Sequence, residues 1–212
     1  MKLFFQYCPS GFSNCYMLGS DIPQDDHREA AHPQEAIIID PGIIDTYLLR
    51  AIEDNYYKLK GILITHDHPH HVQGVKTLMK IYNTEIFAIN PIISGHRSTL
   101  VKNGDLINIG SFKTEVISIP GHSADSAVFK IDRLLFTGDS LTAGLMGSTA
   151  SLYAASTQVN AIRSKIFSLP GDYTVLPGHG PPSSLEAQRR HNIQINSFDI
   201  SKNRSPAFKL DF

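Results

Sequence analysis

Four histidines stand close together in residues 63–74, LITHDHPHHVQG, directly after an apolar run. They are His66, His68, His70 and His71. Neutral imidazole is a preferred ligand of zinc, iron and manganese, and no cysteine lies nearby to complete a closed structural zinc site. The cluster therefore indicates an open metal site, in which a water or substrate can reach the ion.

Three further candidate ligands follow apolar runs that end in turns containing glycine. His122 stands in SIPGHS, Asp139 in LFTGDS and His179 in VLPGHG. Because strand ends converge at one edge of layered α/β structures, we expect these side chains to meet the histidine cluster. Asp139 has two carboxylate oxygens and can bridge two ions. Two ions about 3.5 to 4 Å apart lower the pKa of a bridging water to about 7, which suits hydrolysis.

The segments between these residues alternate between strand and helix patterns. The expected strands cover residues 14–20, 35–42, 59–65, 84–90, 105–110, 112–121, 127–139 and 173–180. The expected helices cover residues 44–58, 75–82, 158–168 and 184–192. Strands that alternate with helices favour parallel pairing. The first two strands suggest a hairpin with a long exposed loop, in which His27 and His32 are solvated side chains.

Composition favours one globular domain over residues 1–212. The chain has 42% hydrophobic residues and a formal charge of −1, with no basic cluster that would suggest nucleic acid or a membrane as partner. A small-molecule partner is expected, and the sequence indicates no oligomeric state. The N-terminal segment is too short and irregular for a signal peptide, so we expect a cytoplasmic protein in which Cys8 and Cys15 are reduced thiols.

The ordered series THDHPHHVQG, PGHS, GDSL and PGHG, preceded by SNCYML and IIIDPG, resembles the motifs of the metallo-β-lactamase superfamily. The resemblance is closest to its hydroxyacylglutathione hydrolase (glyoxalase II)-like branch and runs from about Asn14 to His191. It implies a four-layer αββα sandwich with two divalent ions at one edge, with zinc as the first choice and iron or manganese as alternatives. The ligand set it implies is His66, His68 and His122 for the first ion, His71 and His179 for the second, and Asp139 as the bridge.

One position departs from the family pattern. The family segment reads H-x-H-x-D-H, and this chain has His70 in the place of the acidic residue. In relatives that Asp binds the second metal and hydrogen-bonds the bridging hydroxide, so His70 affects both the second site and the aim of the nucleophile. We predict that His70 is still a ligand with a catalytic role, and that Asp67 caps the following helix or supports a ligand. His96 and His191 are expected to lie outside the site.

The substrate side also differs from glyoxalase II, which carries a C-terminal helical domain that helps to bind glutathione. Only 33 residues follow His179, so that domain is not expected here. Related sequences usually show a Gly-Arg-x-Asp element after the bridging Asp, whereas this chain has GLMGSTASLYAAS. The segment predicts a less charged wall, with Ser148 and Tyr153 as substrate contacts.

Three functions remain open from the sequence. The first is a hydrolase of a small thioester, ester or lactone that uses a metal-bound hydroxide. The second is an oxidoreductase similar to a mononuclear iron persulfide dioxygenase, which the changed His70 would favour. The third is a metal-binding member with an altered site and no turnover. β-Lactamase activity is the least expected, because that role usually requires export.

Overall fold

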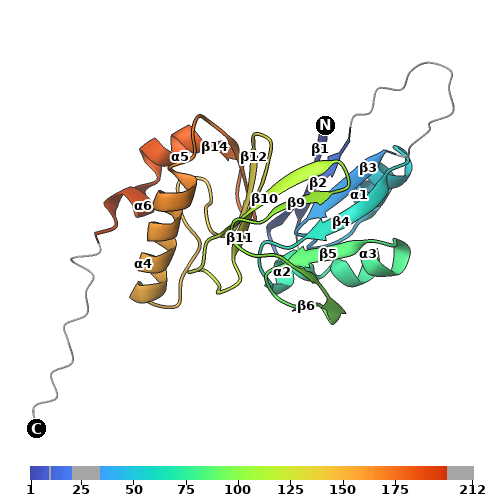
Figure 1. Ribbon diagram of the computed structural model, residues 1–212, viewed down its shortest axis with the longest axis horizontal. Helices are drawn as coiled ribbons and strands as arrows, with labels where there is room; N and C mark the ends of the chain where they lie inside the picture. The colour runs from blue at the N-terminus through green and yellow to red at the C-terminus, as the bar shows by residue number, and fades with distance from the viewer. Residues whose placement is uncertain (10, 21–33, 200–212) are drawn as a thin grey trace, which may run out of the picture.

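Two six-stranded sheets form the centre of the protein in the computed structural model, which describes residues 1–9, 11–20 and 34–199 (Figure 1). The first sheet has the order β1 (Lys2–Cys8), β2 (Ser13–Gly19), β3 (Glu35–Ile39), β4 (Lys58–Leu63), β5 (Glu85–Ala88) and β8 (Thr99–Leu100). The second has the order β14 (Ser183–Ser184), β13 (Thr174–Pro177), β12 (Leu134–Gly138), β11 (Ala127–Ile131), β10 (Phe112–Ser118) and β9 (Leu106–Ile109). A separate two-stranded ribbon joins β6 (Ile92–Ile93) and β7 (His96–Arg97).

Helices cover the outer face of each sheet. On the first sheet lie α1 (Thr46–Glu53), α2 (Pro69–Val72) and α3 (Val75–Ile81). On the second lie α4 (Leu152–Ala161), which continues into the π-helical turn η1 (Ile162–Ile166), then α5 (Leu185–His191) and α6 (Ile193–Ser197). This is the αββα sandwich that the sequence predicted. Within the described residues, no helix is both long and apolar enough to cross a membrane.

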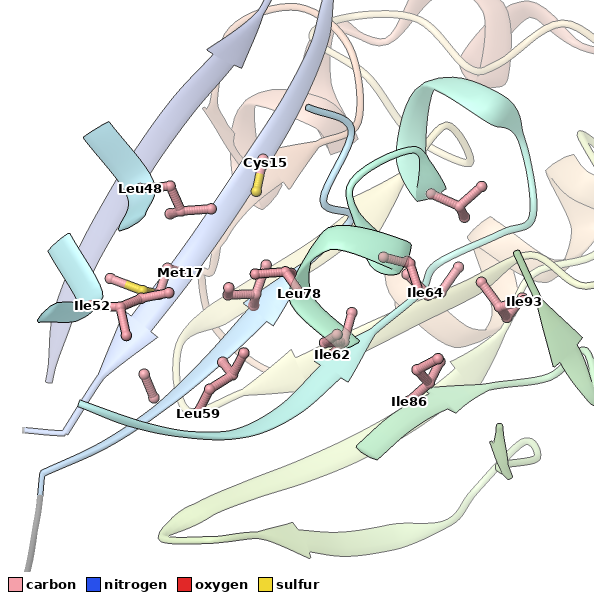
Figure 2. Close-up of a cluster of buried hydrophobic side chains, with 14 of the residues drawn as sticks. Cys15, Met17, Leu48, Ile52, Leu59, Ile62, Ile64, Leu78, Ile86 and Ile93 are labelled. Atoms are coloured by element: carbon pink, nitrogen blue, oxygen red, sulfur yellow. The ribbon is translucent and has the colours of Figure 1, made fainter. Parts of the chain in front are cut away.

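Alternation of side chains along the strands produces the layers. In β3, Ile37 and Ile39 belong to the apolar cluster between the two sheets, whereas Ile38 belongs to the cluster beneath α1 and α3. Successive residues of a strand point to opposite faces, so an unbroken apolar run is what a strand buried on both faces requires. Figure 2 shows the cluster on the helix side, where Ile62 lies near Leu78. A third apolar cluster fills the space between the second sheet and α4, η1 and α5.

Parallel pairing is present where helices separate the strands. β3, β4 and β5 pair in parallel, as do β12 and β13, whereas β1, β2 and β3 form an antiparallel run. The predicted pairing of the first two expected strands is confirmed by β2 and β3. Their connecting loop, with His27 and His32, lies outside the described residues. Cys8 and Cys15 are both buried free thiols, as expected.

Some boundaries differ from the sequence prediction for local reasons. The helix expected at 158–168 begins earlier, at Leu152, because the hydroxyl of Ser151 accepts a hydrogen bond from the Ala154 N–H and caps the first turn. The helix expected at 44–58 is shorter, because Asp45 caps its start and Tyr56 adopts a positive φ of 53° beyond its end. The sequence prediction contained no strand at β1.

Candidate metal centre

The candidate ligands come from four chain segments that each follow a strand. His66 and His68 follow β4 and precede α2, which carries His70 and His71. The other three residues, His122, Asp139 and His179, follow β10, β12 and β13. The structure brings six of these seven side chains into two groups whose ligand atoms lie within 4.8 Å of one another. The first group is His66, His68, His122 and Asp139, and the second group is His71, Asp139 and His179.

Asp139 belongs to both groups, and its two oxygens face different histidines. Oδ2 lies 3.7 Å from Nε2 of His66 and 3.5 Å from Nε2 of His122. Oδ1 lies 2.7 Å from Nδ1 of His179 and 3.7 Å from Nε2 of His71. The carboxylate therefore stands between two sets of imidazoles, with one oxygen toward each set.

Two of the imidazoles are buried with nitrogen atoms that have no hydrogen-bond partner. His66 is 1% exposed and His71 is fully buried. Nε2 of His66 and both ring nitrogens of His71 lack a hydrogen-bond partner in the protein. Buried polar atoms are nearly always satisfied, so unpaired imidazole nitrogens that face a carboxylate fit the donor set of a divalent metal ion. The His/Asp cluster thus has the chemistry of a metal-binding site.

Asp40 and Thr65 support the buried imidazoles from behind. Asp40, at the end of β3, accepts hydrogen bonds from the backbone N–H of Thr65 at 2.8 Å and from its hydroxyl at 2.6 Å. The same hydroxyl lies 3.1 Å from Nδ1 of His66, and Oδ2 of Asp40 lies 3.4 Å from Nδ1 of His71. Groups that contact the far nitrogen of a ligating imidazole fix its orientation. Neither residue was predicted to support the site, although IIIDPG places an acid at a strand end.

His122 is held by the loop that follows Asp139. Its Nδ1 lies 2.8 Å from the backbone carbonyl of Ser148, which orients the ring so that Nε2 faces Asp139. Gly147 packs so closely on the backbone carbonyl of Asp139 that it leaves no room for a Cβ atom. Ser148 and Tyr153 are exposed, and their predicted contact with substrate stays a prediction.

His70 lies outside both groups. Its side chain is exposed and packs against Gly11, where a Cβ atom would collide with the imidazole. The centroid of its ring lies 6.4 Å from that of His179. Its backbone carbonyl accepts a hydrogen bond from the hydroxyl of Ser13 at 2.8 Å. A ligand or catalytic role for His70 therefore stays a prediction.

Asp67 does not cap α2, so that alternative is wrong. The helix begins after His68 and has no side-chain cap. The backbone N–H of Asp67 instead donates to Oδ2 of Asp125 at 2.9 Å, a contact that fixes the loop between His66 and His68. His96 lies in β7 and His191 ends α5, and neither belongs to the two groups.

The pKa values reflect this crowding of charges. Burial, and then the nearby His71, lower the pKa of His66 to about 3. Burial also disfavours the charged form of His71, but the carboxylates of Asp139 and Asp40 outweigh it and raise its pKa to about 10. Burial opposes ionisation of Asp139, yet His179 and His71 hold the pKa of this carboxyl well below its usual range. The metal-free centre is thus an anionic carboxylate beside a protonated His71.

In the metal-free protein, we expect the free energy of unfolding to be greatest near pH 6.5. Folding lowers the pKa of His66 from 6.5 to about 3, so the unfolded chain binds more protons between these values and stability is lost as the pH falls. Folding raises the pKa of His71 from 6.5 to about 10, so its contribution is fully present below pH 6.5 and is lost as the pH rises through 10. Urea unfolding of chelator-treated protein across this pH range measures the profile.

Two variants separate these contributions. His66→Gln should flatten the acid side of the profile, and His71→Gln should flatten the alkaline side. His96→Gln is the matched control, because this half-buried histidine lies outside both groups and should leave the profile unchanged. A wild-type profile without a maximum, or one that both variants leave unaltered, contradicts the assignment.

The chain matches a family model and proteins of known name. A family model described as the metallo-beta-lactamase superfamily matches residues 11–179. The chain is 36% identical over 147 residues to the hydroxyacylglutathione hydrolase of Francisella tularensis subsp. tularensis (strain WY96-3418), covering 68% of this chain and 58% of that protein. The chain therefore spans less than two thirds of the length of this curated relative.

Solved structures share the fold at lower sequence identity. The structure of the BLEG-1 B3 metallo-beta-lactamase has a TM-score of 0.78 and 23% identity, and the match covers 92% of this chain and 100% of that one. ETHE1 from Myxococcus xanthus has a TM-score of 0.77 and 23% identity, with coverage of 96% and 94%. Both are similar to this chain in fold.

Proposed function

Because the chain belongs to the metallo-beta-lactamase superfamily, we propose that it is a metal-dependent hydrolase of a small thioester, ester or lactone. The observation that carries the proposal is the position of Asp139, whose two oxygens each face a different set of histidines. The name of the relative at 36% identity, hydroxyacylglutathione hydrolase, supports acyl hydrolysis as the reaction type.

We propose that His66, His68 and His122 hold one divalent ion and that His71 and His179 hold a second, with Asp139 shared between them. Zinc is the first candidate, because the donors are imidazole and carboxylate without a thiolate. Such ions, when bound, lower the pKa of water and polarise a carbonyl oxygen. Asp40 and Thr65 keep the imidazoles of His71 and His66 turned toward the centre.

The loops that carry the ligands favour an uncharged substrate. Within the described part of the chain, the segments 64–74, 119–126, 139–151 and 178–182 contain no lysine or arginine. A carboxylate on the substrate would find no cationic side chain there to pair with it. We therefore propose a small, uncharged acyl compound as the partner, rather than nucleic acid or a membrane. We also propose a cytoplasmic location.

Metal analysis combined with a substrate panel tests the proposed function. Protein purified under metal-replete conditions should contain two ions per chain and should hydrolyse at least one neutral thioester, ester or lactone. Two bound ions without turnover on the whole panel would indicate a metal-binding member without hydrolase activity.

A second candidate is a mononuclear iron persulfide dioxygenase-like oxidoreductase. The position of His70 favours it, because without this residue the second group contains only three side chains. The same protein should then hold a single iron and consume oxygen in the presence of a persulfide. A chain with two zinc ions and no oxygen consumption excludes this candidate.

Replacing His70 by aspartate should raise thioester hydrolysis by about 10-fold or more, which corresponds to about 1.4 kcal/mol of the barrier. A carboxylate at this position has two oxygens, one for the second group and one to accept a hydrogen bond from the attacking water. Initial rates and metal content of His70→Asp should be compared with those of the wild type.

His70→Asn is the matched control, because asparagine has the size of aspartate without its charge. This variant should not show the gain. Equal rates and equal metal content in all three proteins would mean that the side chain at position 70 points away from the reaction. A loss of the native activity in His70→Asp alone would mean that histidine is required for it.

A further inference from the structure

The turn that carries His179 is hydrogen-bonded to the start of a strand in the opposite sheet. The turn, residues 177–180, begins at the last residue of β13 in the second sheet, whereas Asn14 and Tyr16 lie in β2 of the first sheet. The backbone N–H of Asn14 donates to the carbonyl of Gly178 at 2.7 Å. The side-chain amide of Asn14 donates to the carbonyls of Pro177 at 2.9 Å and Gly180 at 2.7 Å.

These contacts surround His179 on both sides. Three carbonyls, at positions 177 and 178 before the histidine and 180 after it, accept hydrogen bonds from Asn14. The hydroxyl of Tyr16 also donates to the Pro177 carbonyl, at 2.8 Å. Ser13, the residue before Asn14, forms an isolated β-bridge with His179 itself. The conformation of the turn is therefore set largely by β2.

Asparagine suits this position for a chemical reason. Asn14 is 2% exposed, so water cannot replace its hydrogen bonds. Its amide nitrogen supplies two N–H donors, and the two side-chain contacts use both of them. Aspartate has nearly the same size and shape, but its oxygens would face two carbonyl oxygens and could donate to neither when ionised.

We infer that Asn14 is a positioning residue that holds His179 in place for the second metal ion. The inference rests on the proposed function, because it assumes that His71, Asp139 and His179 bind an ion. Asn14 acts through the backbone of the turn, so its influence should be confined to His179. The first group takes its histidines from the segments after β4 and β10, which the described hydrogen bonds of Asn14 do not touch.

The test is the variant Asn14→Asp. The chelator-treated full chain is titrated with Co²⁺, and binding is monitored by absorption spectroscopy and by calorimetry. We expect the affinity for the second ion to fall by at least about 10-fold, as for other residues that support a metal ligand, while the first ion binds as in the wild type. Equal loss of both ions, or no loss of either, would overturn the inference.

Gln6→Glu is the matched control for destabilisation. Gln6 is also a buried amide of the first sheet, and its Nε2 donates to the carbonyl of Ile43 at 2.8 Å. The two variants should lower the melting temperature of the metal-free protein, but only Asn14→Asp should weaken the second ion. If Gln6→Glu weakens it equally, the effect is one of general stability and the inference is wrong.

Imidazole ¹H–¹⁵N spectra of the metal-free chain separate this inference from the proposed function. Asn14→Asp should change the ring signals of His179 and leave those of His66 and His122 in place. Unchanged His179 signals would overturn the inference, whatever the metal content. A wild-type chain that binds a single ion would instead contradict the dinuclear centre, while the spectra still decide the role of Asn14.

Discussion

Asp139→Asn should reduce hydrolysis by about a thousandfold or more, because the two groups lose the one charged oxygen donor that they share. An amide offers a single oxygen and no negative charge, whereas the carboxylate of Asp139 lies 2.7 Å from His179, 3.5 Å from His122 and 3.7 Å from His71. Metal content should fall in parallel. Steady-state rates on the most reactive substrate and elemental analysis of the same sample measure both effects.

Asp172→Asn provides the control for this substitution. Oδ1 of Asp172 accepts hydrogen bonds from the backbone N–H groups of Tyr173 and Glu186, contacts that an asparagine oxygen can retain, and the residue belongs to neither ligand group. This variant should keep its metal and its activity. Near-wild-type turnover in Asp139→Asn would reject the shared role of the carboxylate.

Gly178→Ala should expel the ion held by the second group and remove most of the activity. A Cβ atom at this position would lie 2.5 Å from Oδ1 of Asp139 and 2.7 Å from Cε1 of His71, closer than side chains normally approach. The added methyl group would therefore push these two side chains apart. Metal titration should show one ion instead of two, with turnover reduced by about a hundredfold or more, since misplacement by about 1 Å has effects of that size.

Gly180→Asn tests the same turn without the collision. Gly180 has a positive φ of 79° with nothing within 4 Å of its Cβ position, and asparagine tolerates this backbone conformation better than most residues. The variant should bind two ions. Retention of both ions by Gly178→Ala would mean that the two groups lie further apart in solution than in the structure.

The ligand positions were predictable because each depends on a local pattern. An apolar run followed by a glycine-containing turn and then His122, Asp139 or His179 places the polar side chain at a strand end, whatever the rest of the chain does. The order of motifs then gave the fold, and the αββα prediction is confirmed. That these side chains bind metal stays a prediction that the variants above test.

The supporting residues were not predictable, because their partners are distant in the sequence. Asp40 reaches Thr65 across 25 positions, and Asn14 reaches Gly180 across 166. The hydrophobic periodicity of the sequence does not indicate contacts between residues so far apart. The position of the His70 side chain was not predictable either, because its exclusion from the two groups depends on packing against Gly11 in another segment.

Strand β1 was missed for a related physical reason. Phe4 packs with Tyr57 on the helix side, whereas Phe5 contacts Tyr16 on the side of the other sheet. Apolar residues thus point to both faces, and the segment lacks the polar and apolar alternation by which a half-buried strand is recognised. Its position at the edge of the sheet leaves no further sequence signal.

The division of the two ligand groups between the halves of the chain links metal affinity to folding. His66, His68 and His71 come from the first sheet's side, whereas His122, Asp139 and His179 come from the second. An ion bound in either group therefore also joins the two sheets, and thermodynamic reciprocity requires that tighter association of the sheets strengthen ion binding. A buried residue such as Phe129, in the cluster between the sheets, would thereby contribute to the retention of a bound ion without contacting it.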